Sequence, residues 1–240
     1  MVADNPAADA PVADGVAAPA VETVGLTKVY GELVALAPLT VQIEPGERVV
    51  VVGTNGSGKT TLIRMLAGLL EPTEGTAAIA GDPAGSIDAR AALSYVPDDP
   101  VVYDDLSLAE HIEYVARLHE TEGWQARAAY LLDRLGIDHR ADDLPVRFSR
   151  GLRQKTSLAL GLVRPFEVLL VDEPFVGLDQ SGKAALVELL GEAADEGATL
   201  VIATHQLEFV DRATRCIALR DGELIYDGAA DSAKIAELLG

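Results

Sequence analysis

The chain has 240 residues, and its 38 Asp and Glu residues against 19 Lys and Arg residues give a formal charge of −19. This length can bury the core of one large domain, or of one domain with an inserted subdomain. The excess of acidic residues disfavours nucleic-acid binding driven by net charge, because phosphate backbones repel a negative surface. The one cysteine, Cys216, excludes an internal disulfide and fits a packing role in a reducing compartment. No apolar run approaches the roughly 20 residues that span a bilayer.

Residues 1–20 are rich in Ala, Pro and Asp and contain no Lys or Arg, which predicts a disordered tail and no secretory signal. The folded part, residues 21–240, is expected to begin with antiparallel strands between residues 22 and 50, where β-branched residues recur between turn signals. Residues 48–52 form an apolar run typical of a strand buried on both faces. Residues 60–69 are predicted to form the helix that follows this strand.

Helical periodicity then extends from residue 107 to about residue 135, with one apolar face formed by Leu108, Ile112, Val115 and Leu118. This stretch predicts an inserted helical subdomain at approximately residues 98–165. Two further apolar runs, residues 167–171 and 198–203, are expected to be buried strands, each followed by a helix. Because strands alternate with helices, the sequence favours an α/β fold with a mostly parallel sheet and an antiparallel β region.

A glycine-rich loop follows the first buried strand, and it matches the pattern G-x-x-x-x-G-K-[ST] at every fixed position: Gly53, Thr54, Asn55, Gly56, Ser57, Gly58, Lys59 and Thr60. Its glycines let several backbone N–H groups point at one anion, and the next helix adds the positive end of its dipole. Lys59 is expected to bind the β- and γ-phosphates, while the Thr60 hydroxyl ligates Mg²⁺ and Thr61 lies beside the nucleotide. The loop therefore predicts a nucleotide site on a P-loop NTPase core.

An acidic pair, Asp172 and Glu173, follows the apolar run at residues 168–171. A phosphate-binding loop needs a carboxylate at the end of a neighbouring strand, so Asp172 is predicted to hold Mg²⁺ and Glu173 to polarise the attacking water. His205 ends the next predicted strand. Its position alone leaves two interpretations open, a structural histidine or a contact to the γ-phosphate.

With these residues placed, the chain from about residue 21 to about residue 228 resembles the nucleotide-binding subunit of ATP-binding cassette (ABC) transporters. The motifs occur in the family's order: Lys28-Val29-Tyr30-Gly31, the phosphate-binding loop, Ser94-Tyr95-Val96-Pro97-Asp98, Phe148-Ser149-Arg150-Gly151-Leu152-Arg153-Gln154-Lys155, Asp172-Glu173-Pro174, Gly177-Leu178-Asp179 and Thr204-His205. Seven short matches in order are hard to obtain by accident. Their variants look most like bacterial cassettes of the exporter type.

The resemblance implies roles for residues outside the phosphate-binding loop. Tyr30 stands where the family stacks an aromatic ring on adenine, and His205 would steady the γ-phosphate. Ser149 and Gly151, just before a predicted helix at about residues 153–162, would close over the γ-phosphate of a second cassette. Ser149 as a plain helix N-cap is compatible with that role.

Three residues depart from the common family pattern. Asp98 stands where the family has a glutamine that senses Mg²⁺ and the attacking water, which makes it a weak metal candidate. Arg150 replaces a glycine, and either adds charge toward the opposing phosphate or faces solvent. Leu152 replaces a glutamine.

The resemblance implies an ATPase subunit that uses ATP and Mg²⁺, dimerises with itself or a paralogue, and drives a separate membrane permease, in the exporter direction. It also implies a cytoplasmic protein held on the inner face of the membrane through that permease, with no nucleic-acid partner. One alternative is a soluble cassette protein of repair or translation, which more often carries two cassettes or a basic surface. A P-loop kinase or GTPase is the other, but an acceptor lid and an Asn-Lys-x-Asp motif are not evident.

Overall fold

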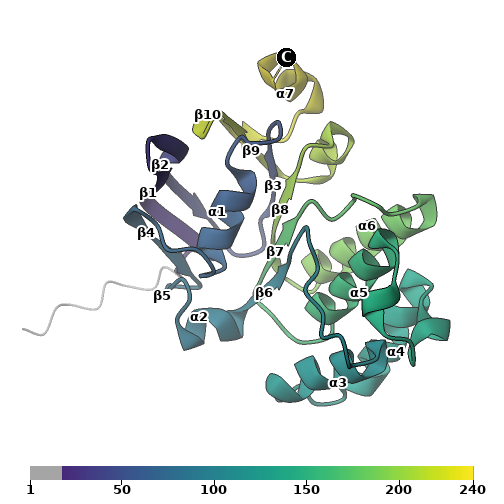
Figure 1. The fold of residues 1–240 in the computed structure, drawn as a ribbon. Helices are drawn as coiled ribbons and strands as arrows, with labels where there is room; N and C mark the ends of the chain where they lie inside the picture. Colours follow the sequence, from purple (N-terminus) through teal and green to yellow (C-terminus); the bar gives the residue numbers. More distant parts are fainter. Residues whose placement is uncertain (1–17, 240) are drawn as a thin grey trace, which may run out of the picture.

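The computed structural model of the chain describes residues 18–239 as one arrangement of two β-sheets and surrounding helices (Figure 1). The tail predicted at residues 1–20 lies outside the described residues except for its last three positions. Residues 21–239 contain all of the helices and strands described below.

The first sheet is antiparallel and has the strand order β2-β1-β4-β5. Strands β1 (Val21–Tyr30) and β2 (Leu33–Ile43) form the hairpin expected between residues 22 and 50. The sheet is larger than that prediction, because β4 (Glu74–Ile79) pairs with β1 and β5 (Asp82–Pro83) pairs with β4. The predicted antiparallel region is thus confirmed and extends beyond the first helix of the fold.

The second sheet has six strands in the order β10-β9-β3-β8-β7-β6. The pairs from β9 through β6 are parallel, and only β10 is antiparallel to its neighbour, so the mostly parallel sheet is confirmed. The strands are β3 (Arg48–Val52), β6 (Leu93–Val96), β7 (Val168–Asp172), β8 (Thr199–Thr204), β9 (Arg215–Arg220) and β10 (Glu223–Ala229). All five residues of β7 are buried, as its continuous apolar run predicts.

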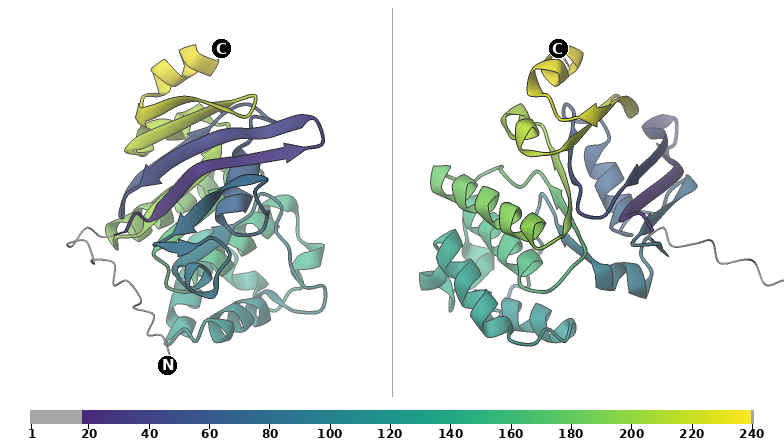
Figure 2. Two further views of the ribbon diagram at one scale, coloured as in Figure 1. Left: turned by 90° about the vertical axis from the view of Figure 1, so that its left-hand side faces the viewer. Right: turned by 180° about the vertical axis from the view of Figure 1, so that it is seen from behind.

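The helices form layers on both faces of the parallel sheet (Figures 1 and 2). Helix α1 (Lys59–Leu66) lies between the two sheets, where Leu62 and Ile63 belong to the core cluster that also holds Leu170 of β7. Leu169 of β7 points to the opposite face, which helices α5 (Arg150–Leu162) and α6 (Gln180–Asp195) cover. Successive side chains of β7 point to opposite faces of the sheet, so this one strand contributes to the cores on both faces.

Further helices complete the fold: α2 (Ile87–Ala92), α3 (Leu108–Leu118), α4 (Trp124–Leu135) and α7 (Ser232–Leu239), with 3₁₀ turns at Asp138–Arg140, Pro145–Arg147 and Leu207–Arg212. Helices α3, α4 and α5 fall within the predicted helical subdomain. That residues 98–165 form a separate unit stays a prediction. Among the helices described between residues 18 and 239, none combines the length and the apolarity needed to cross a bilayer.

Two predicted helix boundaries were wrong. The helix predicted at residues 60–69 ends at Leu66, because Gly68 adopts φ 67° and the N–H of Leu69 turns back to the carbonyl of Arg64 at 2.9 Å. The helix predicted from about residue 153 begins at Arg150.

The helical stretch from residue 107 to 135 contains two helices, and its predicted apolar face was partly wrong. Helix α3 stops at Leu118, which is 64% exposed, and α4 begins after Gly123. In place of Leu118 the face buries Ala116 and His111. His111 is only 3% exposed. Its Nδ1 donates to the carbonyl of Ser107 at 2.8 Å, and its Nε2 accepts the N–H of Tyr103 at 2.8 Å.

Cys216 of β9 is fully buried, as expected of a packing residue, and burial raises the pKa of its thiol to about 12. Because the thiolate is the nucleophile, we expect iodoacetamide at pH 8 to leave the folded chain unmodified and to alkylate it once in denaturant. Mass spectrometry of the intact chain measures both states. Alkylation of the folded chain at the rate of a free thiol would contradict this expectation.

Candidate nucleotide-binding site

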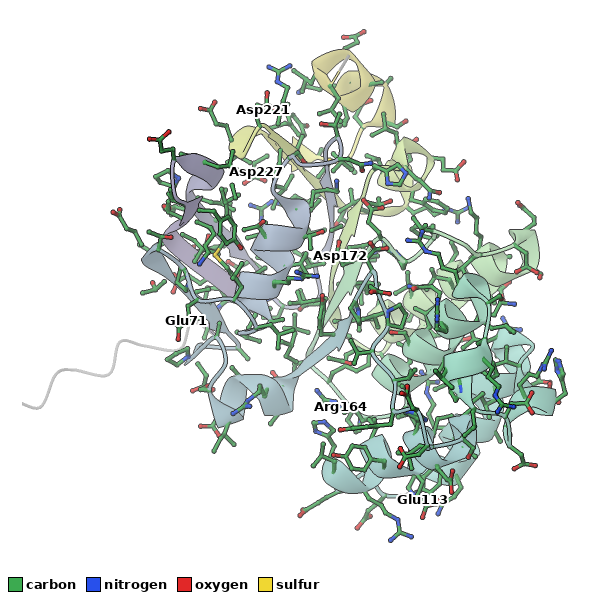
Figure 3. The ribbon with its side chains drawn as sticks, in the orientation of Figure 1. Glu71, Glu113, Arg164, Asp172, Asp221 and Asp227 are labelled. Atoms are coloured by element: carbon green, nitrogen blue, oxygen red, sulfur yellow. The ribbon has the colours of Figure 1, made fainter. Side chains whose placement is uncertain are left out.

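The predicted site residues follow the carboxyl ends of parallel strands, which meet at one edge of the second sheet. Gly53 follows β3, Glu173 follows β7, His205 follows β8 and Asp98 lies just beyond β6. Asp172, the last residue of β7, lies near the centre of the molecule, where β7 contacts α1 (Figure 3). Ligands of open parallel sheets bind at this edge, so the topology brings together groups that lie far apart in sequence.

The phosphate-binding loop, residues 53–60, owes its shape to three glycines with two different functions. Gly56 and Gly58 adopt φ 82° and φ 100°, the left-handed region that favours glycine. Gly53 has no such angle; a Cβ there would collide with the carbonyl oxygen of Leu219. The sequence pattern did not distinguish Gly53 from the other two glycines, but Gly53 is required for close packing rather than for a left-handed backbone angle.

The other residues of the loop differ in their exposure to solvent. Thr54, Asn55 and Gly56 are exposed at the tip, while Thr60 and Thr61 on the first turn of α1 are partly buried. The hydroxyl of Ser57 is buried and has no hydrogen-bond partner among residues 18–239. The N-cap of α1 is Gly58, which has no side chain to occupy the first backbone N–H groups. The start of α1 is therefore suited to an anion.

Lys59 is a buried cation at the centre of this loop. Its Nζ donates to the carbonyl oxygens of Gly53 at 2.9 Å and Thr54 at 3.2 Å, and lies 3.5 Å from Oε1 of Glu173. A buried charge needs such partners, because desolvation is costly. The structure thus places the predicted phosphate-binding lysine beside the predicted catalytic carboxylate.

Glu173 connects Lys59 to His205. Its second oxygen, Oε2, accepts hydrogen bonds from His205 Nδ1 at 2.8 Å and from the His205 backbone N–H at 3.3 Å. With Nδ1 donating, the Nε2 of His205 is left facing away from the carboxylate. Glu173 also adopts φ 47°, a left-handed backbone angle that is strained for a residue with a side chain. The family resemblance implied a phosphate contact for His205, and the sequence did not predict this hydrogen bond to Glu173.

Asp172 is fully buried, and neither of its carboxylate oxygens has a hydrogen-bond partner among the described residues. Burial raises the pKa of Asp172, and the charges of Glu173 and Asp98 raise it further, while the Thr60 hydroxyl and Lys59 act in the opposite direction. A buried carboxylate without partners, close to a threonine hydroxyl, fits a hard divalent cation such as Mg²⁺. The residues present therefore suit the predicted metal.

The same geometry predicts that Asp172→Asn stabilises the nucleotide-free chain. The pKa of Asp172 is raised in the folded state, so the folded chain resists ionisation of this carboxyl more than the unfolded chain does. The free energy of unfolding therefore falls as the pH rises from about 4 toward the raised pKa. An amide avoids this cost, so we expect about 1–3 kcal/mol more stability at pH 7 and a difference that narrows toward pH 4.

Thermal unfolding between pH 4 and pH 8 measures this effect. Asp142→Asn is the matched control, since Asp142 is exposed and makes no side-chain hydrogen bond or ion pair among residues 18–239. An Asp172→Asn chain no more stable than the native chain at pH 7 would show that the buried carboxylate is already compensated.

The predicted signature segment begins helix α5. Ser149 is its N-cap and accepts the N–H of Leu152 at 3.4 Å, so the plain capping role exists and leaves the hydroxyl exposed. Gly151 has a packing function that the sequence did not reveal, because a Cβ there would collide with the carbonyl oxygen of Gly177. Leu152 is partly buried and packs against the core beside α5.

Arg150 and Asp98, two of the three departures from the family pattern, are paired with each other. Arg150 Nη2 lies 3.1 Å from Asp98 Oδ1, with side chains 59% and 42% exposed. The sequence analysis did not predict this ion pair. It could have been predicted from the fact that both positions depart from the family pattern by gaining charges of opposite sign.

Tyr30 lies at the tip of the β1–β2 hairpin, half-exposed, with Lys28 Nζ 5.1 Å from its ring centroid. The hairpin packs against the phosphate-binding loop, since a Cβ on Gly58 would lie 2.7 Å from the carbonyl oxygen of Ala35. Tyr30 is thus on a segment next to the loop, and its stacking on adenine stays a prediction.

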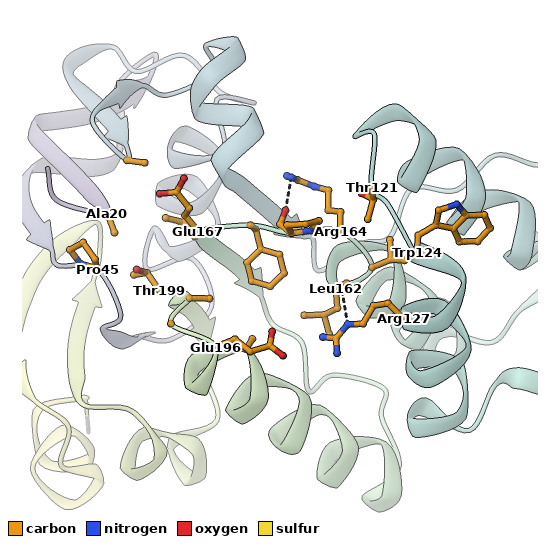
Figure 4. Close-up of a pocket in the computed structure, with 18 of the residues that line it drawn as sticks. Ala20, Pro45, Thr121, Trp124, Arg127, Leu162, Arg164, Glu167, Glu196 and Thr199 are labelled. Atoms are coloured by element: carbon orange, nitrogen blue, oxygen red, sulfur yellow. Dashed lines mark hydrogen bonds between the residues drawn. The ribbon is translucent and has the colours of Figure 1, made fainter. Parts of the chain in front are cut away.

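The hollow at this edge of the sheet is about 490 Å³ and is lined by Gly53, Thr54, Asn55, His205, Leu207 and Leu239. A larger cavity of about 720 Å³ lies at the opposite edge, where β7 and β8 begin (Figure 4). The guanidinium of buried Arg164, which lines this cavity, donates hydrogen bonds to the backbone carbonyls of Ala91 and Pro165, both at 3.0 Å, and to that of Leu93. The guanidinium therefore stabilises the local backbone structure.

Comparison with known proteins identifies the family. The model of the family described as ABC transporter matches residues 36–176. The chain is 37% identical over 205 residues to the SkfA peptide export ATP-binding protein SkfE of Bacillus subtilis, covering 84% of this chain and 86% of that protein. The chain belongs to the ABC transporter family. It is an ATP-binding subunit that hydrolyses ATP with Mg²⁺, and its fold is the P-loop NTPase fold of that family.

Two further comparisons describe relatives of different organisation. The pyoverdine export ATP-binding/permease protein PvdT of Pseudomonas entomophila is 34% identical over 234 residues, which cover 92% of this chain but 36% of that protein. The solved dimeric structure of a post-hydrolysis state of the ATP-binding cassette MJ0796, bound to ADP and Pi, superposes with a TM-score of 0.79 and 26% identity. That match covers 88% of this chain and 99% of the cassette.

Proposed function

We propose that this ABC subunit powers export across a bacterial membrane by closing as a dimer over two MgATP molecules and opening again after hydrolysis. The observation that carries the proposal is the position of Glu173, held between Lys59 at 3.5 Å and His205 at 2.8 Å, at the strand end beside the phosphate-binding loop. A carboxylate placed beside a phosphate-binding lysine is positioned for general-base catalysis.

Binding of the triphosphate uses the loop, the start of α1 and Lys59. The phosphates would take over the hydrogen bonds that Lys59 now makes to the carbonyls of Gly53 and Thr54. The hydroxyl of Thr60 and the buried carboxylate of Asp172 would hold Mg²⁺, which neutralises charge on the phosphate oxygens when bound. Tyr30 would support the adenine from the neighbouring hairpin.

Hydrolysis uses Glu173 and His205 together. Glu173 accepts a proton from the attacking water, and the hydrogen bond from His205 Nδ1 fixes the carboxylate in place for that transfer. The other ring nitrogen of His205 is directed away from Glu173, and when the ring carries both protons this nitrogen can donate to a phosphate oxygen. Because the His205 ring is partly exposed while Glu173 is buried, the pair spans from the interior to the surface of the site.

A second chain completes the site in this proposal. Ser149 and Arg150 are exposed at the start of α5, so they are accessible to a partner. The solved MJ0796 cassette that this chain superposes on is dimeric. Ser149 and Gly151 would present the first N–H groups of α5 to the γ-phosphate held by that partner, either an identical chain or a paralogue.

The permease is proposed to be a separate protein that holds this subunit at the inner face of the membrane. PvdT joins an ATP-binding part and a permease in one chain, and this chain spans about a third of it. The names of SkfE and PvdT both include export, which supports the exporter direction over import.

The test is affinity purification of the tagged chain from gently solubilised native membranes, followed by mass spectrometry of the bound proteins. Recovery of a multi-span protein in stoichiometric amount is the expected result. Recovery only from the soluble fraction, or with ribosomal or DNA-repair proteins, would instead support the soluble-cassette alternative and overturn the transport role. Mock purification from the untagged strain is the control for membrane contaminants.

A further inference from the structure

Arg150 contacts two segments that follow different strands of the parallel sheet. Its guanidinium pairs with Asp98 in the β6–α3 loop, residues 97–107, at 3.1 Å. Its aliphatic stem lies against the β7–α6 loop, residues 173–179, since a Cβ built on Gly177 would lie 3.3 Å from Arg150 Cγ. One side chain at the start of α5 thus touches the loop after β6 and the loop after β7.

Both loops have a second attachment. The β6–α3 loop is held at Tyr103, whose N–H donates to Nε2 of buried His111 at 2.8 Å. The β7–α6 loop begins with Glu173 and ends at Asp179, which caps α6 and lies 3.4 Å from Lys155 of α5. Each loop is therefore also held by its own surroundings, and Arg150 supplies a contact that both loops share.

We propose that Arg150 is a positioning residue that holds the loop carrying Asp98 and the loop carrying Glu173 in register with helix α5. The inference rests on the proposed function, because only in an ATPase does the register of these loops affect turnover. Asp98 and Arg150 are then a matched pair that replaces the family's glutamine and glycine together. An Arg150 that only faced solvent would leave both loops to order independently.

The size of the effect follows from the exposure of the pair. Ion pairs between half-exposed side chains couple by about 1.4- to 5-fold in an equilibrium constant. We therefore expect little change in global stability and a change of that order in the ordering of the loops. The register matters for the chemical step more than for nucleotide binding, since Lys59 and the phosphate-binding loop lie on a different strand.

Two measurements on the full chain test this inference. Hydrogen exchange of the nucleotide-free chain is expected to be about 2- to 5-fold faster at residues 97–107 in Arg150→Ala and in Asp98→Ala, with no further increase in the double variant. ATPase assays are expected to show a kcat lowered by a similar factor with an unchanged KM for ATP. Arg150→Lys is expected to recover part of both losses, because it keeps the charge and most of the stem.

The control is another exposed pair in the same helical region, Arg140 and Asp143, at 2.8 Å with side chains 43% and 49% exposed. Its alanine variants are expected to leave exchange at residues 97–107 and kcat unchanged. Exchange at residues 97–107 equal to the native rate in Arg150→Ala, or fully additive effects of Arg150→Ala and Asp98→Ala, would overturn the inference. If the native chain lacked ATPase activity the proposed function would fail, and the exchange data would still decide the role of Arg150.

Discussion

Glu173→Gln is expected to bind MgATP at least as tightly as the native chain. Its hydrolysis rate is expected to fall to about one hundredth of the native rate or below. Binding is preserved because the substitution removes an anion 3.5 Å from Lys59, in the region that the phosphates would occupy. Turnover falls because an amide cannot accept the proton of the attacking water. Calorimetric titration with MgATP and a steady-state phosphate-release assay measure the two quantities.

Glu167→Gln is the matched control for this variant. Glu167 directly precedes β7 and is exposed, so Glu167→Gln makes the same chemical change at the other end of this strand, away from the site. We expect it to leave both affinity and turnover at native values. Native turnover by Glu173→Gln would remove the catalytic role of this residue and leave the buried contact to His205 as a purely structural one.

The local parts of the site were predictable from the sequence because each one is a short run whose neighbours determine its structure. The phosphate-binding loop lies between a buried strand and a helix start, and the acidic pair directly follows a strand of apolar residues. The parallel order of the strands then brings Gly53, Asp172 and His205 to one edge. No contact across the chain had to be known in advance for these three.

The remaining features depend on contacts between distant positions. Arg150 and Asp98 lie 52 residues apart, and Gly151 is required to be glycine by a carbonyl 26 residues later, at Gly177. His111 has the sequence environment of a surface histidine, yet the β6–α3 loop folds over it and uses both of its ring nitrogens. Tertiary packing of this kind leaves no periodic signal in a single sequence, so these roles appear only in the folded chain.

Burial of charge connects the stability of the site with its chemistry. The two carboxylate oxygens of buried Asp172 have no hydrogen-bond partner within residues 18–239, and Glu173 has a strained backbone angle. Both features cost folding free energy in the nucleotide-free chain. Binding of a cation and a polyphosphate would relieve part of this cost. That relief strengthens binding to the folded state, so the nucleotide is expected to raise the melting temperature.

Lys59→Ala is expected to weaken MgATP binding by about 100-fold, because it removes the one buried cation of the phosphate-binding loop among the described residues. The variant also leaves the carbonyls of Gly53 and Thr54 without their donor and the Glu173 carboxylate without its nearest cation. That negative carboxylate then repels the phosphates. Calorimetry with MgATP measures the loss, and circular dichroism with thermal unfolding establishes that the variant is folded.

Two further variants separate the causes of this loss. Lys234→Ala on α7 removes one positive charge from an exposed position and is expected to retain native affinity, which excludes an effect of net charge. The double variant Lys59→Ala with Glu173→Gln is expected to recover part of the affinity, because the repulsive carboxylate is gone. If the double variant binds no better than Lys59→Ala, the loss comes from the missing lysine contacts alone. Unchanged affinity in folded Lys59→Ala would place the triphosphate outside the loop at residues 53–60.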